Sequence, residues 1–166
     1  LTATTHHPVD SYAEVRAHDQ VMRYRRAGTG HPLLVLRSSL EPHPLWAELD
    51  DALIGAFRVL TPDVHSAGVH VAQWMRDFLE GVGLERVTII ADDSLCITAL
   101  EMVLLNADQV ERMVLVPAGT ASETGLDGTL ATSLAGVTVP LLVVRRGLSA
   151  SEAVPLLMQF LGHGRA

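Results

Sequence analysis

Three consecutive polar residues, Asp92, Asp93 and Ser94, stand where a β-favouring stretch meets a helix-favouring one. Residues 87–90 are all β-branched, and the residues from 95 onward carry apolar side chains at helical spacing. This order predicts a strand, a tight turn and a helix, with the polar side chains at the turn. In an open α/β sheet, ligands bind beside the turn that follows a central strand. Because an aspartate in a cleft can act as a general acid, a general base or a nucleophile, we expect the reacting groups here.

Polar residues also follow the other predicted strands. Because the carboxyl ends of parallel strands meet at the same end of a sheet, we expect these side chains to form one polar cleft. Arginine donates hydrogen bonds to anionic and carbonyl oxygens, so it suits substrate binding. The expected catalytic residues are Asp93, Ser94, Asp92 and His65. The expected substrate-binding residues are Arg37, Ser38, Ser39, Arg145 and Arg146.

The same residues also allow a structural interpretation. In it, arginines and aspartates pair with one another, and Asp92 caps the helix that follows it. Asp63, His65 and Asp92 or Asp93 are suitable metal ligands by type, but their scattered spacing does not favour a metal site. We therefore expect no metal and no cofactor. Cys96 lies among apolar neighbours, and we expect it to be a small buried residue.

Strand-like and helix-like segments alternate along the chain. Two alternating stretches, 12–18 and 20–26, predict an antiparallel hairpin at a sheet edge. Further strands are predicted at 32–36, 57–61, 87–90, 113–116 and 137–144, and helices at 45–56, 69–81, 95–106 and 150–161. This order predicts an α/β fold: a doubly wound, mostly parallel sheet with right-handed crossovers and an antiparallel N-terminal edge hairpin. We expect a flexible tail over residues 1–10 and a single domain over residues 11–166.

Composition narrows the classes of partner. The chain has 166 residues, of which 48% are apolar and 19% charged, with a net charge of −7. This acidity argues against nucleic acid or an anionic membrane as a partner. One cysteine permits no internal disulfide and suits a reducing compartment. No apolar run reaches about 18 residues and no signal peptide is visible, so we expect a soluble, cytoplasmic protein.

Four stretches, 23–30, 57–63, 83–90 and 106–116, resemble segments of the α/β-hydrolase superfamily, in the same order and at the same spacing. The resemblance covers about residues 12–161. It implies the α/β-hydrolase fold, with residues 91–95 at the turn that carries the nucleophile, the nucleophile elbow. It also places Asp93 at the nucleophile position, which is similar to the dehalogenase-like branch that uses an aspartate.

The chain departs from the family pattern at several catalytic positions. The two glycines of the elbow are Ala91 and Leu95, and Arg37-Ser38 stands where the family has the His-Gly of its oxyanion loop. Ser149 takes the position of the family's catalytic acid. We find no counterpart in the sequence, before the closing helix, to the family's last strand and the loop with the general-base histidine, and the lid is reduced to residues 120–136. His65 and His43 lie at the correct end of the sheet but not at the family's base position, whereas we expect His163 at the opposite end.

We therefore expect a small, lid-less member that has lost the Ser-His-Asp triad. The first hypothesis is a non-hydrolytic enzyme, such as a cyclase, dehydratase or isomerase, that acts on a polar small molecule through Asp93. The second is a non-catalytic binding or scaffold protein, and the third is a residual esterase with Asp93 or Ser94 as nucleophile. Because an unpaired strand at 137–144 would need a partner, we also expect a homodimer formed through that sheet edge.

Overall fold

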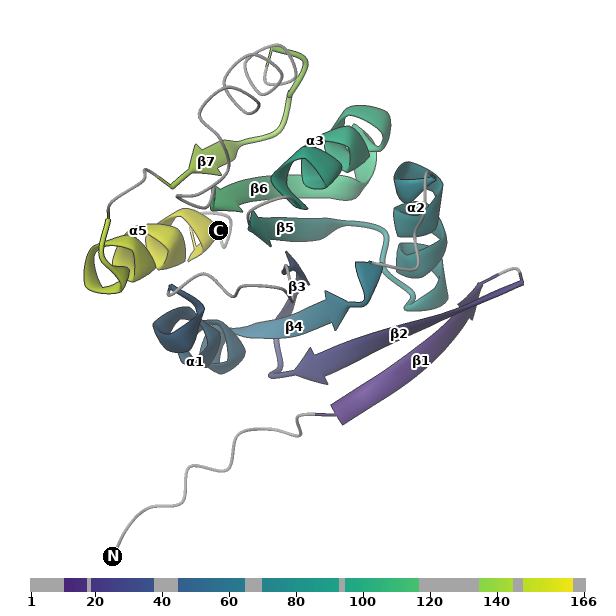
Figure 1. The fold of residues 1–166 in the computed structure, drawn as a ribbon, viewed down its shortest axis with the longest axis horizontal. Coiled ribbons are helices and arrows are strands. Elements are labelled where there is room, and N and C mark those ends of the chain that lie inside the picture. The colour runs from purple at the N-terminus through teal and green to yellow at the C-terminus, as the bar shows by residue number, and fades with distance from the viewer. Residues whose placement is uncertain are drawn as a thin grey trace, which may run out of the picture.

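A seven-stranded sheet with helices on both faces organises the chain (Figure 1). The computed structural model describes residues 11–17, 19–37, 45–64, 70–92, 95–116, 135–144 and 148–162. The strands are β1 (Ser11–Ala17), β2 (Gln20–Ala27), β3 (His31–Leu36), β4 (Phe57–Pro62), β5 (Val87–Asp92), β6 (Val110–Val116) and β7 (Leu141–Val143). The helices are α1 (Trp46–Ala56), α2 (Val71–Gly81), α3 (Leu95–Leu105) and α5 (Ala150–Gly162), with a 3-10 turn at Ala107–Gln109. None of the described helices is long and apolar enough to cross a membrane.

The sheet has the order β1-β2-β4-β3-β5-β6-β7. β1 pairs with β2, and β2 with β4, in antiparallel fashion, while every pair from β4 to β7 is parallel. From β3 the chain adds β4 on one side of that strand, and then adds β5, β6 and β7 in succession on the other side. The order in which strands are added across the sheet therefore reverses between β3 and β5. Ligands of doubly wound folds bind at such a reversal, at the carboxyl ends of the strands. The predicted fold class and edge hairpin are confirmed.

Two hydrophobic cores lie on opposite faces of the sheet. α2 and α3 cover one face, and α1 and α5 cover the other. Successive side chains of a strand point to opposite faces. In β5, Val87, Ile89 and Ala91 belong to the α2–α3 core, whereas Ile90 belongs to the α1–α5 core. Thr88 and Asp92, two residues either side of Ile90, therefore face α1 and α5, one near each end of the sheet.

Helix α1 forms because its apolar residues recur at helical spacing. Trp46, Leu49 and Leu53 are all buried on the face that packs against the sheet. The chain reaches β3 through Gly28, whose φ of +77° lies in the left-handed region. A Cβ at Gly28 would collide with the carbonyl oxygens of Ile54 and Phe57. A glycine is thus required where this turn passes the end of α1.

Two predicted strand boundaries are wrong. β5 extends to Asp92, which pairs with Val116 of β6 instead of starting the turn. β7 has three residues, not the eight predicted over 137–144, because Pro140 has no N–H to add to the ladder. The carbonyl of Pro140 still accepts a hydrogen bond from the Met113 N–H. The predicted tail at 1–10 and most of the predicted lid at 120–136 lie outside the described residues.

Candidate functional site

The turn between β5 and α3 is the predicted centre of the site. β5 ends at Asp92 and α3 begins at Leu95, so the turn consists of residues 93 and 94. These two residues lie outside the described part of the chain. The helix nevertheless starts directly at the carboxyl end of the central strand, where its free N–H groups and the positive end of its dipole favour negative charge. The flanking elements are therefore those of the predicted strand–turn–helix.

Asp92 is buried in the sheet and does not lie in the turn. None of its surface is exposed, and the indole nitrogen of Trp46 donates a hydrogen bond of 2.6 Å to its Oδ2. Trp46 is the first residue of α1 and is 1% exposed. A buried carboxylate needs such a donor because it has lost its water. This contact ties α1 to the last residue of β5.

Arg37 lies over the face of the same tryptophan ring. It follows β3 directly, and its guanidinium carbon is 4.7 Å from the centre of the Trp46 ring. One of its terminal nitrogens donates to Oδ2 of Asp50 in α1, at 2.8 Å. The Arg37 side chain is 23% exposed. Arg37, Trp46 and Asp92, with Asp50, therefore form one connected set, which we call the carboxyl-end network.

The other predicted site residues divide into two groups. Asp63 follows β4 and is exposed, and Cys96 is buried with its thiol 3.5 Å from the carbonyl oxygen of Ala91. The remaining predicted residues lie outside the described part of the chain, and their roles stay predictions: Ser38, Ser39, His65, Asp93, Ser94, Arg145 and Arg146. In the described ranges, no group of three or more His, Cys, Asp and Glu side chains could hold a metal ion. His70 directly precedes α2 and is exposed, so it places a further imidazole side chain at this end of the sheet, one that was not among the predicted site residues.

Ser149, which the sequence places at the position of the family's catalytic acid, directly precedes helix α5. Its backbone N–H donates to Oε2 of Glu152 at 2.9 Å, and its hydroxyl donates to the same oxygen at 2.8 Å. The Ser149 carbonyl accepts from the N–H groups of Glu152 and Ala153. The hydrogen bonds that the Ser149 backbone N–H and hydroxyl donate to Glu152 lower the pKa of its carboxyl, and the backbone bond has the larger effect. Ser149 thus occupies the N-cap position of α5, directly before its first residue, Ala150.

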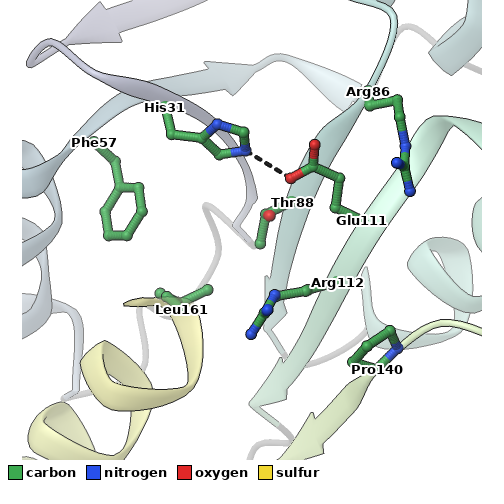
Figure 2. A pocket seen from close by; sticks show the side chains of 8 residues that line it. All are labelled: His31, Phe57, Arg86, Thr88, Glu111, Arg112, Pro140 and Leu161. Carbon is green, nitrogen blue, oxygen red and sulfur yellow. Dashed lines mark hydrogen bonds and ion pairs between the residues drawn. The ribbon is translucent and has the colours of Figure 1, made fainter. Parts of the chain in front are cut away.

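A second polar cluster lies at the opposite, amino end of the sheet (Figure 2). A cleft of about 310 Å³, the amino-end cleft, is lined by five polar residues: His31, Arg86, Thr88, Glu111 and Arg112. Phe57, Pro140 and Leu161 supply its apolar lining. The sequence prediction did not include this cleft, because its residues precede or begin strands and do not follow them. The available signal was a set of polar residues near the starts of β3, β5 and β6.

Comparisons with known proteins bear on the fold. Neither a protein-family model nor a curated protein matches the chain. Solved structures do match. A CIB-like hydrolase from Thermoplasma acidophilum has a TM-score of 0.66 at 14% identity, covering 93% of this chain and 99% of that one. Carboxylesterase CesB (YbfK) from Bacillus subtilis has a TM-score of 0.56 at 19% identity, covering 66% of this chain and 44% of that one.

The epoxide hydrolase CorEH is similar at a TM-score of 0.55 and 24% identity, over 65% of this chain and 42% of its own. The chain thus spans less than half the length of the carboxylesterase and the epoxide hydrolase, but nearly all of the Thermoplasma protein. The sheet order, the helices on both faces and these neighbours agree with the resemblance seen in the sequence. The chain has the α/β-hydrolase fold.

Proposed function

We propose that the protein is an enzyme that converts a polar, carbonyl-bearing small molecule at the carboxyl end of the sheet, with Asp93 as the reacting group. One observation carries this proposal: only two residues join β5 to α3. In this fold, such a short strand-to-helix turn presents the nucleophile. Asp93 is the first of the two turn residues, and its carboxylate would have the start of α3 beside it.

The chemistry we propose is non-hydrolytic, of the cyclase, dehydratase or isomerase type. Ser149, which stands at the family's acid position, has its hydroxyl engaged with Glu152 instead of a histidine. Leu95, at the second glycine position of the elbow, is part of α3 and packs against the α2–α3 core. Both features favour loss of the Ser-His-Asp relay that ester hydrolysis requires. Proton transfer by one carboxyl group needs no such relay.

A second candidate is a non-catalytic binding or scaffold protein. The carboxyl-end network favours it, because Arg37 donates to Asp50 and Asp92 accepts from Trp46, both within the protein. An arginine held in this way stabilises α1 against the sheet whether or not a substrate binds. The Arg37 guanidinium has five N–H donors, however, and its partial exposure leaves it able to bind a ligand as well.

The outer edge of β7 is where we propose that a second copy of the chain pairs. Among the described residues no strand bonds to that edge, and Val143 is 40% exposed. Unpaired edges of this kind are covered or paired in stable proteins. Light scattering should give twice the monomer mass, and Val143→Lys should lower it to the monomer mass. A monomeric mass for the unaltered protein would refute the dimer.

The reaction is tested by incubating the protein with hydroxyketones and keto acids, separating the products from the substrates by chromatography and measuring the product masses. We expect a product of unchanged mass, or one lighter by a single water. Asp93→Asn should lower its rate by at least about 100-fold, the usual contribution of one acid–base group. Asp108→Asn, which changes an exposed carboxylate in the 3-10 turn, is the matched control and should retain the rate.

Other results would decide between the alternatives. Hydrolysis would establish a hydrolase and overturn the non-hydrolytic proposal. It would appear as an epoxide converted to a diol heavier by one water, or as an aryl ester split into its acid and its phenol, in either case lost in Asp93→Asn or Ser94→Ala. Saturable ligand binding that needs Arg37, with no turnover of any compound, would support the binding protein. Equal rates in Asp93→Asn and Asp108→Asn would exclude Asp93 as the reacting group.

A further inference from the structure

The amino-end cleft lies at the other end of the sheet from the proposed reaction. His31 and Phe57 are the first residues of β3 and β4, and Thr88 and Arg112 are paired neighbours on β5 and β6. Leu161, in the last turn of α5, closes one side (Figure 2). The cleft is thus built from regular elements. At about 310 Å³ it is large enough for a small organic molecule.

Thr88 is the most deeply placed polar residue of the cleft. It is 4% exposed and lines the cleft. A threonine hydroxyl can both donate and accept a hydrogen bond, so it suits a polar ligand atom. In Figure 2 the side chain lies between the His31–Glu111 pair and Arg112. A carboxylate oxygen in the cleft can accept a hydrogen bond from this hydroxyl.

The charges around Thr88 favour an anion. Oε2 of Glu111 is 2.7 Å from Nε2 of His31, so the carboxylate already has a partner. Arg112 and Arg86 bring two positive charges to the same lining. Arg112 spends one N–H on the carbonyl of Phe160, near the end of α5, at 2.6 Å. Because a carbonyl oxygen is neutral, it does not compensate the positive charge of Arg112. The other N–H groups of the guanidinium can still donate to a ligand.

We propose that the amino-end cleft binds a small organic monoanion, with its carboxylate on Arg112 and Thr88 and its apolar body against Phe57 and Leu161. Two arginines against one glutamate leave one net positive charge when His31 is neutral. The cleft thus carries a net positive charge, whereas the whole chain has a net charge of −7. The apolar residues select a carboxylate with a hydrocarbon body over inorganic anions. This site is independent of the reaction proposed above, because it shares no residue with the carboxyl end of the sheet.

The test uses the full chain with benzoate, which has a carboxylate and an apolar ring, and with benzamide, its neutral counterpart. Backbone amide NMR spectra should show saturable shifts at Thr88, Glu111 and Arg112 with benzoate, with a dissociation constant of about 1 mM. Thr88→Val keeps the shape of the side chain and should weaken binding about tenfold, the effect of one hydrogen bond to a charged group. Arg86→Gln should weaken it about twofold, since Arg86 is exposed and contributes charge only.

Arg16→Gln, on the distant strand β1, is the matched arginine control and should bind benzoate like the unaltered protein. Arg112→Lys keeps the charge but loses the planar fork, so binding should weaken while the fold is retained. Benzamide binding as tight as that of benzoate would refute the anion site. So would equal affinity in Thr88→Val, or shifts confined to Asp92 and Cys96 at the carboxyl end. Absence of shifts up to about 50 mM, well above the expected constant, would also overturn the proposal.

Discussion

The indole nitrogen of Trp46 lies 2.6 Å from a carboxylate oxygen of Asp92, although 46 positions separate the two residues along the chain. The contact joins the first residue of α1 to the last residue of β5, beside the turn that we propose to be reactive. Both side chains are buried. The position of the last residue of β5 therefore depends on a helix that belongs to a different part of the sequence.

Replacing Trp46 by Phe should destabilise the protein. The change keeps an aromatic ring but removes the N–H, which leaves the Asp92 carboxylate buried with one donor fewer. We expect a loss of at least about 2 kcal/mol in the free energy of unfolding, measured by urea denaturation, from the lost donor and the smaller ring together.

Trp74→Phe is the matched control for that prediction. Trp74 is also buried, in α2, but its indole nitrogen has no hydrogen-bond partner among the described residues. Its removal relieves an unsatisfied donor, so the destabilisation should be smaller than for Trp46→Phe by about 1 kcal/mol or more. Equal losses in the two variants would show that the Trp46–Asp92 bond contributes nothing to stability.

Arg37→Lys should separate charge from shape in the carboxyl-end network. Lysine keeps the positive charge near Asp50 but cannot stack a planar group on Trp46. We expect a loss of about 0.5–1 kcal/mol, because the pair is partly exposed and screened by solvent. The fluorescence of a Trp74→Phe background, which leaves Trp46 as the single tryptophan, should shift with the substitution. An unchanged spectrum and stability would contradict the stacking contact.

Most of the fold is visible in local patterns. Continuous apolar runs at β3 and β5 predict buried strands, and alternation in β1 and β2 predicts a hairpin, because each pattern reflects burial of one or both faces. The helices follow from apolar residues at a period of 3.6. These features depend on neighbours close in sequence, so the sequence predicts them within a few residues.

Apart from β7, which Pro140 shortens locally, the failures arise where a distant residue decides the outcome. Asp92 resembles a turn residue by type, but Trp46 supplies a donor that lets it end a fully buried strand. The amino-end cleft depends on the pairing of Thr88 with Arg112 and on the packing of α5 above them. No spacing within the sequence reports such contacts. They appear only once the strand order and register are known.

Two glycines near the same helix should respond in opposite directions to alanine. Gly28→Ala forces a side chain into the left-handed region and against the carbonyl oxygens of Ile54 and Phe57, so it should cost about 2 kcal/mol or more. Gly55→Ala, inside α1, meets nothing within 4 Å and replaces a poor helix former, so it should add about 0.5–1 kcal/mol. Urea denaturation of both variants measures the difference. A stabilised Gly28→Ala variant would be incompatible with the turn described here.

The start of α5 should make stability depend on acid pH. The Ser149 backbone N–H and hydroxyl lower the pKa of Glu152, so the folded state binds the proton more weakly than the unfolded chain. Its contribution is therefore complete above the ordinary glutamate pKa of about 4.3 and is lost as pH falls through the lower folded value. The stability difference between the protein and Glu152→Gln should shrink over that range in urea titrations. Ser149→Ala should retain much of the pH dependence, because the backbone N–H is the larger cause; a pH-independent difference for Glu152→Gln would refute the assignment.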